Sequence, residues 1–472
     1  MDRKKFLGTT TAILGASALA PTSVALGQKK SENQTSFDLS DIPIFCGHEH
    51  WGSIFAIGYS STGFLADVVP GIMPERKTSL ADLLLDPYMS GNLNGAGINP
   101  REFPDGHKKV DIIEKAANAP LEAFKLASKA LKEFQLKGTY QCLRLGIDFA
   151  YDFDISEYDQ AGINTTNSSI GNNYDRMFSW YKKLMKKANL SELIRPVQPE
   201  FYFGDFNTIS ALEELSFTST LLRIDPLLKF WEEDNSRREN LSSKLGVDPI
   251  DANSWREFLE KLFTHAAENS CIGIKQLQAY SRNLDFEIVK DKDVKFRGKL
   301  SDTEVKPFQD WVMHECCSLA NSRKWPHQIH VGTNNLPNSN PLPLERLAKM
   351  YPDQKIVMLH CWPYFKESGY LAMQYSNVYI DTCWQQILNP EFLTQSLETW
   401  LGYIPLNKIT MSNDSTSIEM AVGSSLITRQ VVSKALFAQK KITNLNEKRM
   451  MEMAAGLLYN NAVNIYKIGK VL

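Results

Sequence analysis

Residues 42–52 read IPIFCGHEHWG, a short apolar run followed directly by two histidines that stand two residues apart. Side chains at i and i+2 of an extended chain point to the same face, so the imidazoles of His48 and His50 converge if the strand geometry continues. Two neutral imidazoles on one face form half of a site for a divalent ion such as zinc, iron, copper or nickel. Ordinary surface or capping histidines would also fit an isolated His-x-His, so the rest of the chain has to decide.

Short apolar runs alternate with helical stretches through the C-terminal part of the chain. With the run before the two histidines, they give eight predicted strands: Ile42–Cys46, Leu193–Val197, Thr220–Ile224, Cys271–Leu277, Gln328–Val331, Ile356–Leu359, Val378–Ile380 and Ile409–Met411. This alternation is typical of a parallel sheet with crossover helices. Eight such units predict an α/β fold of the (β/α)8 TIM barrel type, in which the active site lies at the carboxyl ends of the strands. A doubly wound open sheet is the alternative, although no Gly-x-Gly-x-x-Gly follows any strand.

A long insertion separates the first two predicted strands and occupies residues 60–190. Residues 60–107 are rich in Gly, Pro and Asp, and we expect loops there with one short helix near Leu80–Leu85. Residues 110–137 are predicted to be helical with a break at Pro120, and residues 172–190 to form another helix.

Polar side chains stand at the carboxyl ends of several predicted strands. His330 and His360 each end an apolar run, Asp414 follows the last one, and Lys275 lies near the end of Cys271–Leu277. Because these strand ends meet at one rim of a barrel, these residues predict a metal site together with His48 and His50. The other four histidines lack this placement and are predicted to be structural or surface residues: His107, His265, His314 and His327.

The order of these residues resembles the amidohydrolase superfamily, in its amidohydrolase-related branch. That superfamily has a metal-dependent (β/α)8 barrel with His-x-His after strand 1, histidines after strands 5 and 6, and an aspartate after strand 8. The matches are His48-Glu49-His50, His330 in PHQIHV, His360 in VMLHC and Asp414 in MSNDS. The resemblance covers about residues 41–466 and is strongest over 270–425, and the helical block at 110–190 also looks like that of uronate isomerases.

The resemblance implies that His48, His50, His330, His360 and Asp414 bind one or two divalent ions, with zinc as the first expectation and manganese or iron as alternatives. In two-metal relatives a lysine after strand 4 is carboxylated and bridges the metals, and Lys275 is similarly placed. Alternatively, Lys275 stays a cation and holds a substrate carboxylate with help from Arg282. A lysine paired with a buried acid is the structural alternative.

These residues predict a metal-dependent hydrolase, in which a metal-activated water attacks a C–N or ester bond of a small, anionic substrate. Asp414 would bind the metal and take a proton from the water, and His360 would bind a second ion or polarise the substrate oxygen. Arg223 and Arg144 could clamp an anionic group or form structural salt bridges, and Trp362 could line the pocket. A sugar-acid isomerase or decarboxylase on the same scaffold is an alternative, since fold and ligands do not fix the reaction. A non-catalytic exported binding protein is the third hypothesis.

The first residues of the chain differ in character from the rest. Residues 1–27 have a basic start, a weakly apolar middle and a small-residue end, as in an export signal peptide. Arg3-Lys4-Lys5 resembles the twin-arginine signal with lysine in the second arginine place. We expect residues 28–40 to be a linker, residues 41–472 to form a single domain, and the protein to be periplasmic or extracellular.

Composition limits the expected partners. The formal net charge is −2 over 472 residues, which gives no global case for nucleic acid or an anionic membrane surface. No later window reaches the run of about 18 apolar residues that a spanning helix needs, so we expect no stable membrane span once the signal is removed. We expect a small-molecule substrate, and a homo-oligomer is compatible with the sequence.

Overall fold

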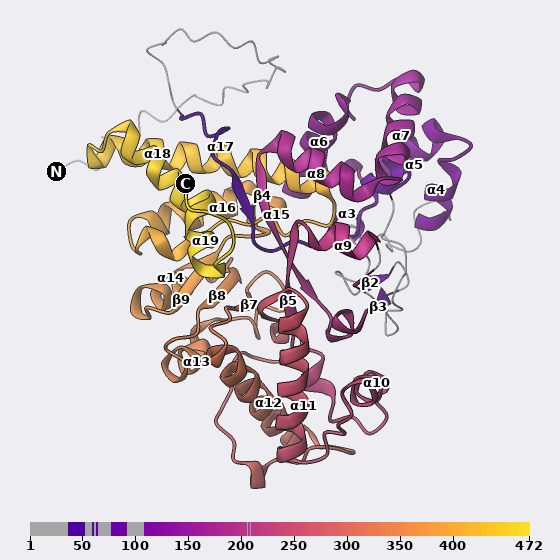
Figure 1. Cartoon of the computed structure of the whole chain (residues 1–472). Coiled ribbons are helices and arrows are strands. Elements are labelled where there is room, and N and C mark those ends of the chain that lie inside the picture. The colour runs from indigo at the N-terminus through magenta and orange to yellow at the C-terminus, as the bar shows by residue number, and fades with distance from the viewer. Residues whose placement is uncertain are drawn as a thin grey trace, which may run out of the picture. The chain divides into compact units, whose positions relative to one another are not determined.

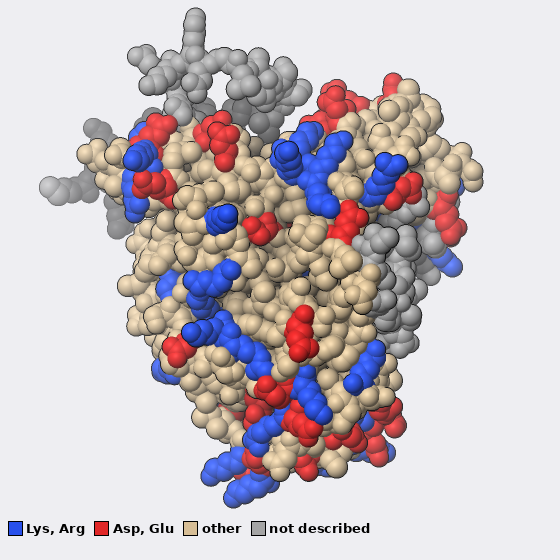
Figure 2. All heavy atoms as spheres, in the orientation of Figure 1, with Lys and Arg blue, Asp and Glu red and all other residues tan. Residues whose placement is uncertain are grey.

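The computed structural model describes residues 36–51, 59–60, 63–64, 77–91, 108–204, 206–207 and 209–472. The predicted signal peptide, most of the predicted linker and His107 lie outside these residues. None of the helices in the described ranges is both long and apolar enough to span a bilayer. Figure 2 shows Lys and Arg side chains interspersed with Asp and Glu over the face in view, in keeping with the near-zero net charge.

Eight parallel strands form one sheet at the centre of the fold (Figure 1). Their order in the sheet follows their order in the chain: β1 (Ile44–Cys46), β4 (Leu190–Val197), β5 (Thr218–Arg223), β6 (Cys271–Gln276), β7 (His327–Val331), β8 (Ile356–His360), β9 (Val378–Asp381) and β10 (Ile409–Thr410). Each coincides with a predicted strand to within a few residues. The prediction of a (β/α)8 TIM-type barrel is therefore confirmed.

The barrel closes through residues just beyond the ends of its first and last strands. The backbone N–H of Asp414 donates to the carbonyl of His48 at 2.9 Å, and the N–H of His50 donates to the carbonyl of Ser415 at 2.9 Å. These two hydrogen bonds join the segments after β1 and β10 at the carboxyl end of the barrel. The His-x-His segment is therefore held beside Asp414 by the backbone itself.

Helices follow the strands and cover the outside of the sheet (Figure 1). They are α9 (Ile209–Leu215), α10 (Ser236–Leu245), α11 (Ala252–Glu268), α12 (Asp302–Ser322), α13 (Glu345–Met350), α14 (Phe365–Gln374), α15 (Gln385–Leu388), α16 (Pro390–Leu401), α17 (Ile418–Thr443) and α18 (Glu447–Ala455). Their buried faces are apolar; α11, for example, buries Trp255, Phe258 and Leu262, as expected of an amphipathic helix against a core. The short hairpin β2 (Tyr59–Ser60) and β3 (Gly63–Phe64) lies outside the barrel sheet.

The predicted helical insertion lies between the first and second barrel strands, β1 and β4. Its helices are α2 (Leu80–Leu84), α3 (Pro87–Gly91), α4 (Lys109–Lys115), α5 (Pro120–Ala130), α6 (Gly138–Tyr151), α7 (Gln160–Tyr174) and α8 (Met177–Ala188). The helix predicted at 172–190 begins too early. Those residues include the end of α7 and the turn before α8, which starts at Met177.

Helix α6 was not predicted from the sequence, because its formation depends on contact with helix α17 rather than on a local helical pattern of its own. A Cβ at Gly146 would lie 1.7 Å from the carbonyl oxygen of Glu419 in α17, and a Cβ at Gly423 would lie 1.7 Å from the carbonyl oxygen of Cys142 in α6. The two glycines therefore let the two helix backbones touch. Glycine lowers helix propensity, so the residues that permit this contact weaken the local helical signal.

The barrel interior is apolar below the strand ends. Phe45, Ile194, Leu221 and Leu359 belong to one buried cluster inside the sheet. The π-helix Gly456–Asn460 and helix α19 (Asn461–Tyr466) add Tyr459 and Tyr466, whose rings lie 5.9 and 5.7 Å from that of Phe45. The seven cysteines are all buried and free. The polar residues predicted for the metal site lie at or just after the carboxyl ends of their strands.

Candidate metal centre

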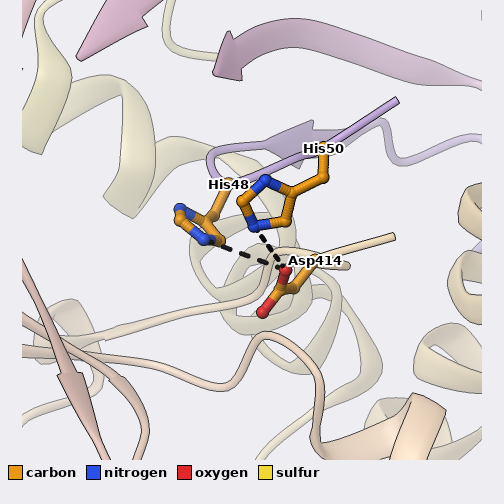
Figure 3. A group of neighbouring side chains, drawn as sticks. All are labelled: His48, His50 and Asp414. Atoms are coloured by element: carbon orange, nitrogen blue, oxygen red, sulfur yellow. Dashed lines mark ion pairs between the residues drawn. The ribbon is translucent and has the colours of Figure 1, made fainter. Parts of the chain in front are cut away.

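His48, His50 and Asp414 converge at the point where the barrel closes (Figure 3). His50 Nε2 lies 3.1 Å and His48 Nε2 3.8 Å from Asp414 Oδ1. The three potential ligand atoms lie within 4.8 Å of one another, His48 and Asp414 are buried, and the His50 side chain is 20% exposed. Two imidazole nitrogens and a carboxylate oxygen at such separations can hold a divalent ion such as zinc.

Gln328 of β7 sets the tautomer of His48. The amide Nε2 of Gln328 donates to the carbonyl of Gly47 at 2.8 Å and to the Tyr466 hydroxyl at 2.6 Å. A carbonyl can only accept, so the other end of the amide, Oε1, faces His48 Nδ1 at 2.7 Å and must accept its proton. With the proton on Nδ1, His48 Nε2 carries the lone pair and faces Asp414. Such supporting hydrogen bonds orient histidine ligands in many metal sites.

A second group forms on the other side of the same carboxylate. His360, Cys383 and Asp414 offer three potential ligand atoms within 4.8 Å of one another, all from buried residues. His360 Nδ1 lies 3.5 Å from Asp414 Oδ2, 3.3 Å from Cys383 Sγ and 2.9 Å from the Cys383 carbonyl oxygen. Asp414 thus has one oxygen toward each group.

His330 lies beside His360, with ring centroids 4.6 Å apart. Its Nε2 is 3.1 Å from the carbonyl oxygen of Gly332, to which it must donate, and this leaves the lone pair on Nδ1. The structure thus brings together all five residues predicted as imidazole or carboxylate ligands, although His330 is not part of either three-residue group.

Burial keeps the imidazoles of His48, His330 and His360 neutral, because desolvation lowers the pKa of each. Desolvation, reinforced by the charge of Lys275, holds the pKa of His48 well below its usual value, and desolvation lowers that of His360 to about 4 against the opposing charge of Asp414. Burial would raise the pKa of Asp414, but His48, His50 and His360 hold it well below its usual range. Neutral imidazoles and an ionised carboxylate are the forms that bind a metal ion, so the donor set fits a divalent metal.

Several residues at this rim adopt a left-handed backbone conformation without being glycine. His360, Trp384 and Asp414 have φ values of 66°, 70° and 60°. This conformation costs roughly 1–2 kcal/mol for a residue with a Cβ. Strain of this kind is typical of functional sites, where the surrounding structure holds side chains in a required direction.

Lys275 is buried at the end of β6, beside Arg223 of β5 in the sheet register. It is 1% exposed, and its Nζ has no hydrogen-bond partner in the described part of the chain. Desolvation lowers its pKa to about 8, although Asp414 acts in the opposite direction. An amine left without a partner costs free energy, which favours a ligand or a modification at this position over a purely structural lysine.

The other predicted substrate-binding residues have structural partners. Arg223 forms two hydrogen bonds with Asp225, at 3.2 and 2.7 Å. Two of the others lie in ion pairs: Arg144 of α6 with Asp154 at 3.3 Å, and Arg282 with Asp310 at 2.7 Å. The pairs of Arg223 and Arg144 fit the structural alternative given for these two residues.

Trp362, which was predicted to line the pocket, stacks on Phe392 of α16 with ring centroids 3.7 Å apart.

Two of the remaining histidines have partners outside the metal groups. His265 Nε2 lies 2.8 Å from the Tyr202 carbonyl oxygen, and His327 Nδ1 lies 3.7 Å from Cys317 Sγ.

Four residues near the site were not predicted as parts of it: Tyr88, Gln328, Cys383 and Glu49. The Tyr88 hydroxyl donates to Asp414 Oδ1 at 2.9 Å. Burial raises the pKa of Glu49 to about 7 despite hydrogen bonds from Ser415 and Asn413. Gln328 had a usable signal, because it stands two residues before His330 and shares its face. Tyr88 had none, since it lies in the loop-rich insertion.

Residues 293–410 match a family model described as Amidohydrolase. This segment of the chain is thus similar to the amidohydrolase family. The resemblance found in the sequence is thereby confirmed. The matched segment contains His330 and His360, whereas His48, His50, Lys275 and Asp414 lie outside it.

Solved structures show the same fold. A uronate isomerase from Thermotoga maritima is 14% identical, with a TM-score of 0.69 over 90% of this chain and 95% of that one. A uronate isomerase from Bacillus halodurans is 16% identical, with a TM-score of 0.63 over 92% and 95%. A presumed metal-dependent hydrolase from Lactobacillus casei is 17% identical, with a TM-score of 0.56 over 92% and 98%. At these identities the likeness concerns the fold alone.

Among curated proteins, the protein fluG of Emericella nidulans is 26% identical over 243 residues. The match covers 46% of this chain but only 28% of fluG. The chain therefore spans little more than a quarter of that relative, and the activity of the whole relative does not transfer to it.

Proposed function

We propose that this protein is an exported metal-dependent hydrolase of the amidohydrolase type that cleaves a C–N or ester bond of a small, anionic substrate. The observation that carries the proposal is the convergence of His48, His50 and Asp414 at the closure of the barrel. The hydrogen bond from His48 Nδ1 to Gln328 also supports the proposal. It fixes the tautomer of His48, which a metal ligand requires and a histidine that only packs in the core does not.

The metal would be held by His48, His50 and Asp414, with His330 and His360 beside it. A divalent ion bound there lowers the pKa of a bound water to near 7 and polarises a carbonyl group. Zinc is our first expectation, because imidazole and carboxylate ligands suit it, and manganese or iron are the alternatives.

Asp414 is suited to accept the proton of the attacking water. The three histidines around it keep its pKa low, so the carboxylate is unprotonated at neutral pH. Tyr88 donates to Oδ1, while Oδ2 faces His360. A proton on Asp414 can then pass to the leaving group, with His360 placed to polarise the substrate oxygen.

Lys275 is the reason for proposing an anionic substrate. Its amine is buried and has no hydrogen-bond partner among the described residues, and the Arg223 guanidinium belongs to the adjacent strand. A substrate carboxylate would satisfy the amine. Carboxylation of Lys275 is the alternative, and the pH dependence of the stability contribution of Lys275 separates the two, because a carboxylated lysine is not a charged amine.

A sugar-acid isomerase is the second candidate. The structural likeness to a uronate isomerase extends over 90% of the chain and therefore spans both the barrel and the insertion. The two reactions differ in atom balance, since hydrolysis adds water and releases two products while isomerisation gives one product of unchanged mass. Mass spectrometry of product mixtures from uronates and from N-acyl and ester compounds separates the two.

Metal content is the deciding measurement. We expect about one or two zinc, manganese or iron ions per chain by plasma mass spectrometry. A His48→Ala/His50→Ala variant should lose at least one ion, whereas His265→Ala, a histidine of α11, should keep them all. A well-folded protein that binds no metal after reconstitution would contradict the proposal and favour a non-catalytic binding protein.

The export part of the proposal rests on residues 1–27 and has its own test. Cell fractionation of the full-length protein should place it in the periplasm or the medium. A variant with Arg3 and Lys4 both changed to Gln should accumulate in the cytoplasm if the twin-arginine route is used.

A further inference from the structure

Two of the seven thiols lie beside an imidazole, Cys317 beside His327 and Cys383 beside His360. Among the described residues, Cys383 is the cysteine that also belongs to a group with a carboxylate. Its Sγ lies 3.3 Å from His360 Nδ1, and Asp414 Oδ2 lies 3.5 Å from the same nitrogen. The thiols of Cys142, Cys271 and Cys361 instead lie near backbone carbonyl oxygens. Cys383 is therefore a buried sulfur with two other donor groups of a metal site around it.

The separations fit a four-coordinate ion. Zinc binds nitrogen or oxygen at about 2.0–2.2 Å and sulfur at about 2.3 Å, so ligand atoms of a tetrahedral site lie about 3.3–3.7 Å apart. The two distances from His360 Nδ1, 3.3 and 3.5 Å, fall in this range. All three ligand atoms lie within 4.8 Å of one another and belong to buried residues.

We propose that Cys383, as a thiolate, binds a second divalent ion together with His360 and Asp414. This inference rests on the proposed function, in which the first ion is held by His48 and His50. Asp414 would then contribute to both sites, since its Oδ1 faces His50 and its Oδ2 faces His360.

Binding requires one proton to leave and one to move. The Cys383 S–H bond breaks, its proton passes to solvent, and the sulfur electron pair goes to the ion. The proton on His360 Nδ1, now donated to the Cys383 carbonyl oxygen, shifts to Nε2 so that the Nδ1 lone pair can also bind. A thiolate is a soft ligand that favours zinc, cobalt and cadmium over magnesium or manganese, and this makes the second position selective.

Cobalt(II) is the probe, because a thiolate bound to it gives a strong near-ultraviolet charge-transfer absorption that nitrogen and oxygen ligands do not give. The full chain is stripped with a chelator and titrated with Co²⁺. We expect the absorption to grow with the cobalt bound at the second position. It should vanish in Cys383→Ser and in His360→Ala, while one equivalent of cobalt still binds.

The matched control is Cys361→Ser. That thiol is also buried and is the neighbour of His360 in the chain, but it lies near the Met358 carbonyl oxygen. We expect the cobalt spectrum and stoichiometry of this variant to match those of the unchanged protein. The His48→Ala/His50→Ala variant should keep the absorption and lose the other equivalent.

The cobalt spectrum of the unchanged protein tests the proposed thiolate site even if a variant fails to fold. Cobalt that binds without the near-ultraviolet absorption overturns the thiolate site and leaves the hydrolase proposal standing. Absorption that survives in Cys383→Ser, or is lost in Cys361→Ser, also overturns it. A protein that binds no cobalt at all contradicts both proposals together.

Discussion

The two sides of Asp414 differ in which ring nitrogen faces the carboxylate. On one side His48 presents Nε2, and Gln328 keeps the proton on the opposite nitrogen. On the other side His360 presents Nδ1, which lies 2.9 Å from the Cys383 carbonyl oxygen and so carries the proton itself. The first group is ready to bind, whereas the second must first exchange a hydrogen bond. Residue types alone would not have shown this difference, which predicts that two ions bind with unequal affinity.

Removing the shared carboxylate should have the largest effect, because both groups depend on it. We expect Asp414→Asn to bind neither ion tightly and to lose about 10²–10⁴-fold in kcat/KM, the usual contribution of a positioned acid or base. Metal content and steady-state kinetics measure this. Retention of one ion at full affinity would show that the two groups are independent of each other.

Replacing Lys275 should separate activity from stability. We expect Lys275→Met to lose about 10–100-fold in kcat/KM on an anionic substrate, as for a lost hydrogen bond to a charged group. The same change should raise the free energy of unfolding at pH 7 by about 1–3 kcal/mol, because it removes a buried cation that no described residue pairs. Chemical denaturation of metal-free protein measures the gain.

The pH dependence of that gain follows from the pKa of Lys275. Its folded value of about 8 lies below the ordinary 10.5, so the unfavourable contribution is present in full below about pH 8. It fades as the pH rises from 8 to 10.5, where the unfolded amine also loses its proton. The stability difference between Lys275→Met and the unchanged protein should shrink over this window. A difference constant from pH 7 to 10.5 would mean that Lys275 is not a charged amine, as after carboxylation.

Gln328→Leu should affect one side of Asp414 only. Without the acceptor on Nδ1, His48 can carry its proton on Nε2, and we expect the affinity for the first ion to fall about 10–100-fold. The second ion should bind as before. Gln354→Leu is the control, because Gln354 is also fully buried but its side-chain atoms have no described partner. Calorimetric titrations measure the two affinities, and an equal loss of affinity for both ions would contradict the difference between the two sides of Asp414.

Tyr88→Phe should have the smallest effect. It removes the hydrogen bond to Asp414 Oδ1, which contributes about 1.5 kcal/mol for a charged acceptor, or about tenfold in rate. Steady-state kinetics measure the loss, and the metal stoichiometry should not change. A loss as large as that of Asp414→Asn would assign Tyr88 a direct part in the chemistry.

The barrel and most of its ligands could be predicted because their signals are local. An apolar run that ends in His330 or His360 shows both the strand and the group at its end within six residues. The supports are not local: the position of Gln328 two residues before His330 shows which face it shares, but its partner His48 lies 280 residues away in the sequence. Cys383 carries no local signal either, because a buried thiol behaves as a small apolar residue. Helix α6 depends on glycines that only its contact with α17 explains.

The closure of the barrel has a consequence for how the protein matures. The hydrogen bonds that join His48 and His50 to Asp414 and Ser415 span more than 360 residues, and Tyr466 supports Gln328 from still later in the chain. Contacts of such sequence separation form late and slowly. A ribosome must therefore finish almost the whole chain before the metal centre can exist, and tight metal binding marks a molecule whose folding is complete.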